Sequence, residues 1–171
     1  MKKLSSTFFL CLIFLLFSSC APDLTDDVEL AYASVSCHTI DGNMWSPKAS
    51  SAMNWSDAID YCNNLTACGY SDWHLPTISE LRTLIQNCSG TVTGGSCGVT
   101  DSCLSYSNCR NDACSGCGYD SNGKYSKLGE TGILWSSSVS GISDLRWGVN
   151  FDDGHVLYLT IGGDNYVRCV R

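Results

Sequence analysis

Apolar residues recur at helical spacing in two neighbouring segments, which form the most regular part of the chain. The apolar face of the first segment, residues 54–65, comprises Trp55, Ala58, Ile59, Cys62 and Leu65. Asn54 is placed to cap a helix here, and Asp57 lies near the positive end of its dipole. The pattern therefore predicts an amphipathic helix with one face in the core.

A second helix is predicted to start directly after Thr77. Thr77 and Glu80 have the spacing of a capping box, in which each side chain satisfies a backbone N–H that the helix leaves unpaired. The apolar stripe of this helix comprises Ile78, Leu81, Ile85 and Cys88. Neither helix carries the spacing of a catalytic set, so we expect both to contribute to the core.

The connection between the two helices, residues 67–76, is too aromatic for a free loop. Gly69 is expected to end the first helix near the C′ position, and Trp73 and Leu75 are expected to pack beneath the connection. His74 could act as a general base or a ligand. It stands without a second histidine or a nearby carboxylate pattern, so a structural hydrogen bond is the preferred interpretation.

Short alternating segments predict strands near both ends of the domain. One short strand is expected on either side of Asp41-Gly42, where the sequence indicates a turn. A hairpin turn is expected at residues 152–154. Four later strands are predicted at residues 133–137, 145–151, 155–161 and 166–171. Two helices followed by an antiparallel meander make an α+β domain.

Residues 88–132, which we call the cysteine-rich segment, are rich in Gly, Ser, Asn and Cys and poor in large aliphatic residues. A structureless loop of this length is usually functional. The C-x-x-C at Cys114 and Cys117, together with two preceding cysteines, could bind zinc. The motif is not repeated, however, and we expect the chain to be exported, as described below, so disulfides are the preferred interpretation. The segment 120–123 resembles the start of a calcium loop without the later acidic ligand, so we expect a plain Asx turn. The four cysteines of the zinc alternative are Cys103, Cys109, Cys114 and Cys117.

Residues 1–19 have the features of an export signal. Met1-Lys2-Lys3 is basic, and residues 8–17 are apolar but too few to span a bilayer. Residues 17–20, Phe-Ser-Ser-Cys, resemble the lipobox of bacterial lipoproteins, so we expect Cys20 to be lipidated and to anchor the chain stably. Ala21, instead of Asp, fits delivery to an outer membrane. The alternative is an ordinary secretory signal, with Cys20 in a disulfide.

The predicted domain organisation is a signal peptide over 1–19, a lipidated cysteine with an acidic tether over 20–33, and one folded domain over 34–171. Residues 22–29 are polar, acidic and aperiodic, as expected of a tether. Without the leader the chain has eight basic and 17 acidic residues, a net charge of −9. This charge excludes nucleic acid as a partner and, without a local basic patch, matches a highly sulfated polysaccharide poorly.

Cysteine usage predicts five disulfides. Of the 12 cysteines, Cys11 leaves with the leader and Cys20 takes the lipid, which leaves an even number in an exported chain. Spacing alone does not assign the pairs. We expect neither a metal ion nor another cofactor. The ten remaining cysteines are Cys37, Cys62, Cys68, Cys88, Cys97, Cys103, Cys109, Cys114, Cys117 and Cys169.

Five sequence blocks carry a resemblance to a known bacterial family. They are WSDAIDYCNNL, GYSDWHLPTISEL, LWSSS, WGVNFDDG and the terminal YVRCVR. Together they resemble the C-terminal domain of the Legionella collagen-like adhesin, which is related to the Fibrobacter major paralogous domain. The resemblance covers residues 43–171. His74 replaces the usual arginine of the family, and the cysteine-rich segment is longer than the family leads us to expect.

The resemblance implies a C-type-lectin-like fold, shared distantly with the formylglycine-generating enzymes. It also implies a disulfide from the first helix to the last strand, which maps onto Cys62 and Cys169. Ligands of lectin-like folds usually lie on the long loop and the adjoining strands. Core packing or turn formation remains the simpler role for each residue there. The candidate ligand contacts are Trp135, Trp147, Asn150, Asp152, Asp164 and Asn165.

We therefore expect a lipid-anchored, non-enzymatic module of the cell envelope that recognises glycan or extracellular protein, as an adhesin does. One alternative is a structural envelope lipoprotein or complex subunit without glycan binding. Another is an enzyme of the formylglycine-generating type, for which Cys114 and Cys117 are the candidate reactive pair. Their neighbours Asp112 and Asp120 disfavour a reactive thiol, and no nucleophile–histidine grouping is apparent.

Overall fold

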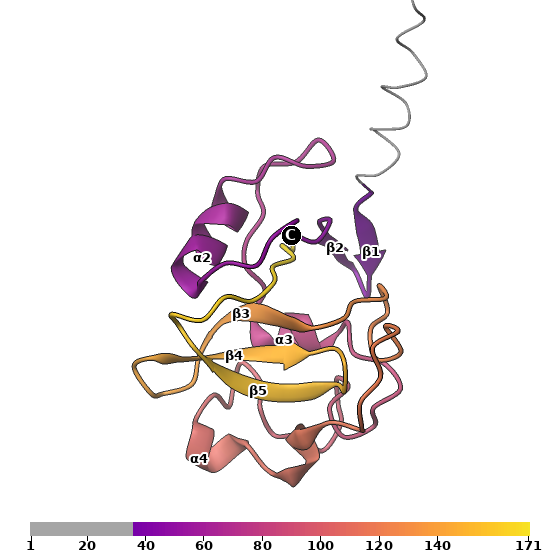
Figure 1. The fold of residues 1–171 in the computed structure, drawn as a ribbon, viewed down its shortest axis with the longest axis vertical. Coiled ribbons are helices and arrows are strands. Elements are labelled where there is room, and N and C mark those ends of the chain that lie inside the picture. Colours follow the sequence, from indigo (N-terminus) through magenta and orange to yellow (C-terminus); the bar gives the residue numbers. More distant parts are fainter. Residues whose placement is uncertain (1–35) are drawn as a thin grey trace, which may run out of the picture.

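A three-stranded antiparallel sheet lies at the centre of the structure, a computed structural model that describes residues 36–171 (Figure 1). Its strands are β3 (Ile133–Val139), β4 (Leu145–Asn150) and β5 (His155–Thr160), in the order β3-β4-β5. The predicted signal peptide, Cys20 and the acidic tether lie outside the described residues. Within residues 36–171, no helix is long and apolar enough to cross a bilayer.

The predicted N-terminal hairpin is present as β1 (His38–Ile40) and β2 (Asn43–Trp45), which pair antiparallel. Its two turn residues, Asp41 and Gly42, both have positive φ angles, 50° and 89°. Aspartate and glycine are among the residues that tolerate this conformation. Local turn chemistry thus explains why the hairpin forms where the sequence predicts it.

The first predicted helix is α2 (Trp55–Asn63), and its cap is as expected: the side chain of Asn54 accepts a hydrogen bond from the backbone N–H of Asp57 at 3.0 Å. The prediction for Gly69 is wrong. The helix ends several residues earlier, and Gly69 instead forms, with Cys68, the two-residue turn of a small hairpin. The backbones of Ala67 and Tyr70 close that turn with two mutual hydrogen bonds.

The second predicted helix starts correctly but is much shorter than its apolar stripe suggests. It is α3 (Ile78–Arg82), and its capping box is fully formed. The chain then tightens into i→i+3 hydrogen bonds, and the backbone N–H of Gln86 donates to the carbonyl of Tyr125. The helix ends because a distant segment supplies this backbone partner. All four stripe residues are nevertheless buried.

The predicted last strand, residues 166–171, is extended but does not join the central sheet, so the meander has three strands and not four. Its backbone partners are divided among three neighbours: Tyr166 bridges to Leu134 of β3, whereas Val170 bridges to Trp45 of β2 and to His74 of the connection before α3. Because no single neighbour pairs with the whole segment, it makes isolated bridges instead of a ladder. It still carries the C-terminus back to β2 (Figure 1).

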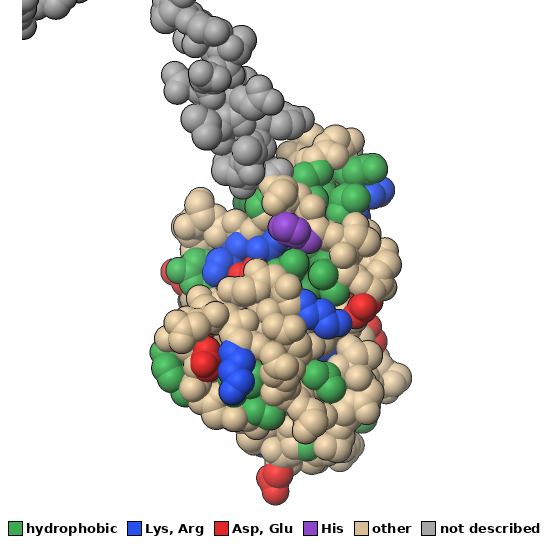
Figure 2. All heavy atoms as spheres, turned by 90° about the vertical axis from the view of Figure 1, so that its right-hand side faces the viewer, with side chains coloured by type: hydrophobic (Ala, Val, Ile, Leu, Met, Phe, Trp, Pro, Cys, Tyr) green, Lys and Arg blue, Asp and Glu red, His purple; other side chains and the backbone are tan. Residues whose placement is uncertain are grey.

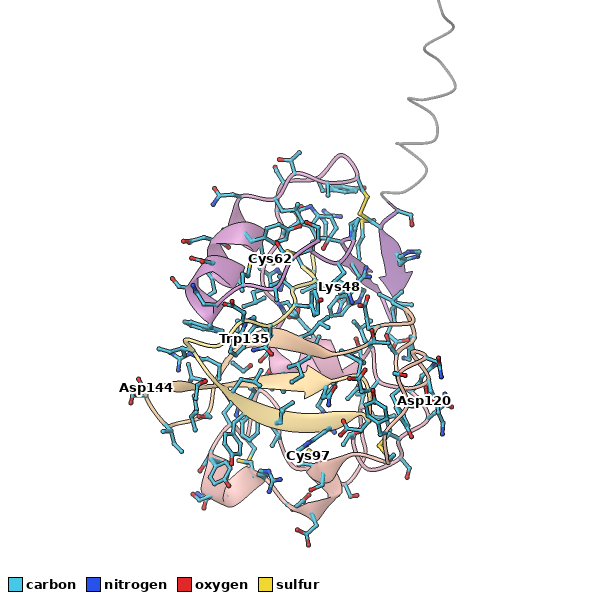
Figure 3. The ribbon with its side chains drawn as sticks, in the orientation of Figure 1. Lys48, Cys62, Cys97, Asp120, Trp135 and Asp144 are labelled. Atoms are coloured by element: carbon cyan, nitrogen blue, oxygen red, sulfur yellow. A yellow bond between two sulfur atoms is a disulfide. The ribbon has the colours of Figure 1, made fainter. Side chains whose placement is uncertain are left out.

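The core consists of two clusters on opposite faces of the central sheet. Trp135 and Cys62 belong to the cluster beneath α2, whereas Trp147, Val149 and Val156 belong to the cluster that packs against α3 and the cysteine-rich segment. Figure 3 shows Cys62 and Trp135 on one side of the sheet and Cys97 on the other. The alternation along the strands that predicted them therefore corresponds to two buried faces, not to one buried and one exposed face.

All ten cysteines of the described residues are oxidised, in five disulfides. One of them joins Cys62 of α2 to Cys169, the pair that the family resemblance implies. The four cysteines of the zinc alternative are distributed over three disulfides, so they do not form a metal site. The other four pairs are Cys37–Cys68, Cys88–Cys117, Cys97–Cys114 and Cys103–Cys109.

Candidate functional site

The two tryptophans predicted to contact ligand, Trp135 and Trp147, have no exposed surface. They lie in the two different core clusters. Each indole N–H donates to a backbone carbonyl: Trp135 to that of Met53 at 2.8 Å, and Trp147 to that of Leu104 at 2.9 Å. Both are core residues because the sheet is covered on both faces, so neither is placed to stack on a ligand at the surface.

The four polar candidates lie at opposite ends of the sheet. Asn150 and Asp152 serve the β4–β5 turn: the Asn150 side chain accepts from the N–H of Asp152, and the Asp152 carboxylate accepts from Gly132 at 2.8 Å. Asp164 and Asn165 follow the far end of β5, beyond the pair Leu145–Thr160. The structure therefore does not gather the six predicted contacts into one site.

His74 makes the structural contact that the sequence suggested. Its Nε2 lies 3.2 and 3.3 Å from the two carboxylate oxygens of Glu80. The same carboxylate accepts from the backbone N–H of Thr77 at 2.8 Å. His74 thus joins the capping box of α3, and its backbone pairs with Val170.

The segment 120–123 forms the predicted Asx turn, in which the Asp120 carboxylate accepts a hydrogen bond from the backbone N–H of Asn122 at 2.9 Å. Over residues 36–171, no three His, Cys, Asp or Glu side chains are grouped in a way that could hold a metal ion.

A buried arginine, Arg82 at the end of α3, organises the cysteine-rich segment. It is 3% exposed and donates to four backbone carbonyls of residues 91–99, those of Thr91, Val92, Cys97 and Val99. Burial lowers the pKa of this guanidinium, but an arginine stays protonated in proteins. This role cannot be predicted from the sequence, because a basic residue in the last turn of a helix is ordinarily solvated.

A second buried charge, Glu130, connects the end of the cysteine-rich segment to the C-terminal segment. It is 3% exposed and pairs with Arg168 and, at 3.3 Å, with the Nζ of Lys48. Lys48 also lies over the ring of Tyr166. Buried charges are tolerated when they are paired in this way, so this group has a sufficient structural role.

One further group of side chains combines an exposed aromatic ring with a cation that has no partner among the described residues. It lies where the Tyr106 ring of α4 (Tyr106–Cys109) meets β5, next to the 3-10 helix η1 (Asp112–Ser115), which packs against β5. The rings of Tyr106 and Tyr158 meet edge to face, with centroids 4.7 Å apart, and Tyr158 is 40% exposed. We call this group, which comprises Tyr106, Arg110, His155 and Tyr158, the tyrosine–arginine surface.

The charge of Arg110 acts on both neighbours from β5. The pKa of Tyr158 is raised, first because its side chain hydrogen bonds to Tyr106, and Arg110 opposes this increase. The pKa of His155 is lowered, mainly because burial disfavours its charged form. Asp153 opposes that decrease, and Arg110 adds to it. The chain geometry agrees with these effects, because Arg110 directly follows α4, and the Tyr106 ring of α4 meets the ring of Tyr158.

Arg110 is unlike every other arginine of residues 36–171. Arg82, Arg146, Arg168 and Arg171 all donate hydrogen bonds, whereas Arg110 makes neither a hydrogen bond nor an ion pair with the described chain. Its Nε is buried without a partner, as is the Nε2 of His155. The Nη atoms of Arg110 are not buried in this way and are accessible to solvent. The guanidinium is thus accessible and unpaired.

The sequence carries one signal for this surface. Arg110 is the only basic residue between Arg82 and Lys124, an isolated cation in a polar insert of an acidic protein. The helical and strand patterns drew attention instead to the residues that proved to be core.

Elsewhere, several basic side chains pair with acidic ones. On the face shown in Figure 2, basic side chains lie next to acidic ones and do not gather in a separate patch. Lys127 pairs with Asp41 at 2.7 Å, and Arg171 with Asp72 at 2.6 Å. This pairing makes the unpaired cation at Arg110 more distinctive.

Comparison with known proteins adds a family assignment. A family model described as the Lcl C-terminal domain matches residues 35–171, which include every residue described by the structure. The search of curated proteins found no match.

Proposed function

Because the chain belongs to the Lcl C-terminal domain family, we propose that it is an adhesin-like surface module that binds glycan or extracellular protein. The observation that carries this proposal is the extent of the match, which takes in the whole described domain. We assign the domain to the C-type-lectin-like fold. The two small antiparallel sheets and the disulfide between Cys62 and Cys169 support that assignment.

We propose that the module is not an enzyme. An enzyme of the formylglycine-generating type would need a reactive thiol pair, for which Cys114 and Cys117 are the candidates. Cys114 is bonded to Cys97 and is fully buried, and Cys117 is bonded to Cys88. A sulfur in a stable disulfide does not supply the thiolate that such chemistry needs.

The proposed location is the cell envelope, with lipid on Cys20 holding the module at the outer membrane. The lipobox-like residues 17–20 support the anchor, and five disulfides support an oxidising compartment. Growth with a labelled fatty acid tests the anchor: the wild-type chain should carry label and a Cys20→Ala chain should not. Label on both chains, or on neither, would contradict it.

Binding itself is tested with the oxidised chain purified without its lipid, applied to a glycan array and to immobilised extracellular matrix proteins. We expect saturable binding to a defined subset, which is lost after the disulfides are reduced. Failure to bind any probe would contradict the proposal. Co-purification of a stable envelope complex in that case would favour the structural-lipoprotein alternative.

A further inference from the structure

We propose that the tyrosine–arginine surface binds a sugar that carries a carboxylate, with Arg110 pairing the carboxylate and the two tyrosines contacting the sugar. This inference rests on the proposed binding function and specifies its ligand. The proposed site is made of residues of the cysteine-rich segment and of β5.

The unpaired guanidinium of Arg110 is the first observation behind this proposal. A planar guanidinium can donate two parallel hydrogen bonds to one carboxylate. Charge-assisted hydrogen bonds of this kind are stronger than neutral ones. In the free protein no carboxylate of residues 36–171 occupies this position. A bound carboxylate would therefore add a partner without breaking an existing ion pair.

The two tyrosines supply the rest of a sugar site. Tyr106 and Tyr158 are fixed against each other edge to face, and Tyr158 lies against Trp147 as well, with centroids 6.5 Å apart. Packing of this kind holds the rings in place before a ligand arrives. An aromatic side chain with a hydroxyl offers both an apolar surface for sugar C–H groups and a polar group for sugar hydroxyls.

Charge selects a carboxylate over a heavily sulfated chain. A single accessible guanidinium can match one acidic group, whereas several sulfates in a row would require several cations. The other basic residues of the same segment are otherwise engaged: Lys127 pairs with Asp41, and Lys124 lies over the ring of Tyr125. The strongly acidic remainder of the chain would repel a polyanion.

His155 provides an internal reporter of binding. Arg110 now helps to keep the pKa of His155 low, together with burial, while Asp153 acts in the opposite direction. A carboxylate on Arg110 would place a negative charge near the imidazole and offset the arginine. The pKa of His155 should therefore rise when the ligand binds.

The test is an NMR titration of the isotope-labelled, oxidised chain with N-acetylneuraminic acid and, separately, with glucuronic acid. The methyl ester of each sugar serves as its uncharged control. We expect shift changes around Tyr158 and a higher pKa for His155 with at least one acid, and at least tenfold weaker binding of its ester. The two acids distinguish a sialic-acid ligand from a uronic-acid ligand.

Variants locate the site. Arg110→Gln should weaken binding of the acid at least tenfold, whereas Lys124→Gln, which removes one exposed positive charge from the same segment, should leave it unchanged. Tyr158→Phe keeps the ring and tests the hydroxyl. If Arg110→Gln does not fold, Tyr158→Phe and the His155 titration of the wild-type chain still decide the matter, since the proposal requires both to respond.

Equal binding of acid and ester, or an unchanged affinity in Arg110→Gln, would overturn the inference. Wild-type protein that binds neutral glycans or matrix proteins but neither acid would also overturn it, while leaving the proposed binding function in place. Binding to none of the array probes and to neither acid would count against both.

Discussion

Arg82 is the clearest case in which one side chain determines the shape of a segment. It carries a buried positive charge whose partners are four backbone carbonyls of residues 91–99, and among the described residues no carboxylate pairs with it. Hydrogen bonds from charged donors contribute more than neutral ones, and a buried acceptor that loses its donor is costly. The fold of this segment therefore depends on a residue that lies outside it.

Replacing this side chain should destabilise the protein strongly. We expect Arg82→Met to lower the free energy of unfolding by about 3 kcal/mol, because four enclosed carbonyls lose their donor. Arg82→Lys keeps the charge but cannot reach all four acceptors, so its free energy of unfolding should lie between those of Arg82→Met and the wild type. Urea unfolding with the disulfides intact measures both. A loss below about 0.5 kcal/mol for Arg82→Met would show that water or a shifted backbone compensates.

His155 should make stability depend on pH in a defined direction. Its pKa in the folded protein lies below the ordinary value of 6.5 because burial disfavours the charged ring. As pH falls below about 6.5, the unfolded chain takes up this proton first, so the folded state loses stability until pH passes the lower folded pKa. The contribution is fully retained above pH 6.5.

The measurement compares the wild type with His155→Gln by thermal unfolding at pH 7.5 and at pH 5. Other titrating groups act in both proteins, so only the difference between them reports on His155. The variant should lose less stability between the two pH values than the wild type. An equal loss in both would mean that His155 protonates as readily in the folded state as in the unfolded state.

At the scale of elements, the starts of the two predicted helices could be read from the sequence and their ends could not. Asn54 and Thr77 act within three residues of themselves, so their effect can be read locally. The end of α3 depends on Tyr125, about forty residues away, and a local pattern carries no information about such a partner.

The capping box of α3 gives a test at this scale. Thr77→Val preserves the shape of the side chain but removes the oxygen that accepts from the backbone N–H of Glu80, and should cost about 1 kcal/mol. Thr77→Ser keeps that oxygen and should cost clearly less. Chemical denaturation gives both values. Equal losses would indicate that the methyl group of Thr77 matters and its hydroxyl does not.

The candidate site was the part least accessible to sequence reasoning. Alternation correctly placed Trp135 and Trp147 in strands, but only the cover on both faces of the sheet shows that neither reaches the surface. Tyr158 lies two residues after the core residue Val156, on the same face of β5, and is nevertheless exposed. Arg110 stands out only when every other arginine is seen to have a partner, which requires contacts between segments far apart in the sequence.

At the scale of the whole molecule, the five disulfides differ widely in the length of chain they close. Cys62–Cys169 spans 107 residues and Cys103–Cys109 only 6. In the chain-entropy model, a cross-link stabilises by restricting the unfolded chain, and more so for a longer loop. The long bridge should therefore contribute more stability than the short one.

Paired substitutions by alanine should show this difference. Loss of Cys62–Cys169 is expected to cost about 4–5 kcal/mol and loss of Cys103–Cys109 about 2 kcal/mol. Each double variant leaves the other four disulfides intact, and the free energy of unfolding is compared in urea. Equal costs would show that native packing around the sulfurs, and not chain entropy, sets the contribution.

The arrangement of the disulfides also limits how far the protein can stretch under tension. Consider a force that pulls between Cys37 and Arg110. The shortest covalent route crosses from Cys37 to Cys68, follows 20 residues to Cys88, crosses to Cys117 and returns 7 residues to Arg110. At roughly 3.4 Å per residue this route extends to about 90 Å, whereas the 73 residues of an uncrosslinked chain would extend to about 250 Å. If the chain is anchored at its N-terminal side and binds ligand at Arg110, as proposed, a receding bound surface would extend this route only slightly, so the force would load the ligand contact before the domain could unravel.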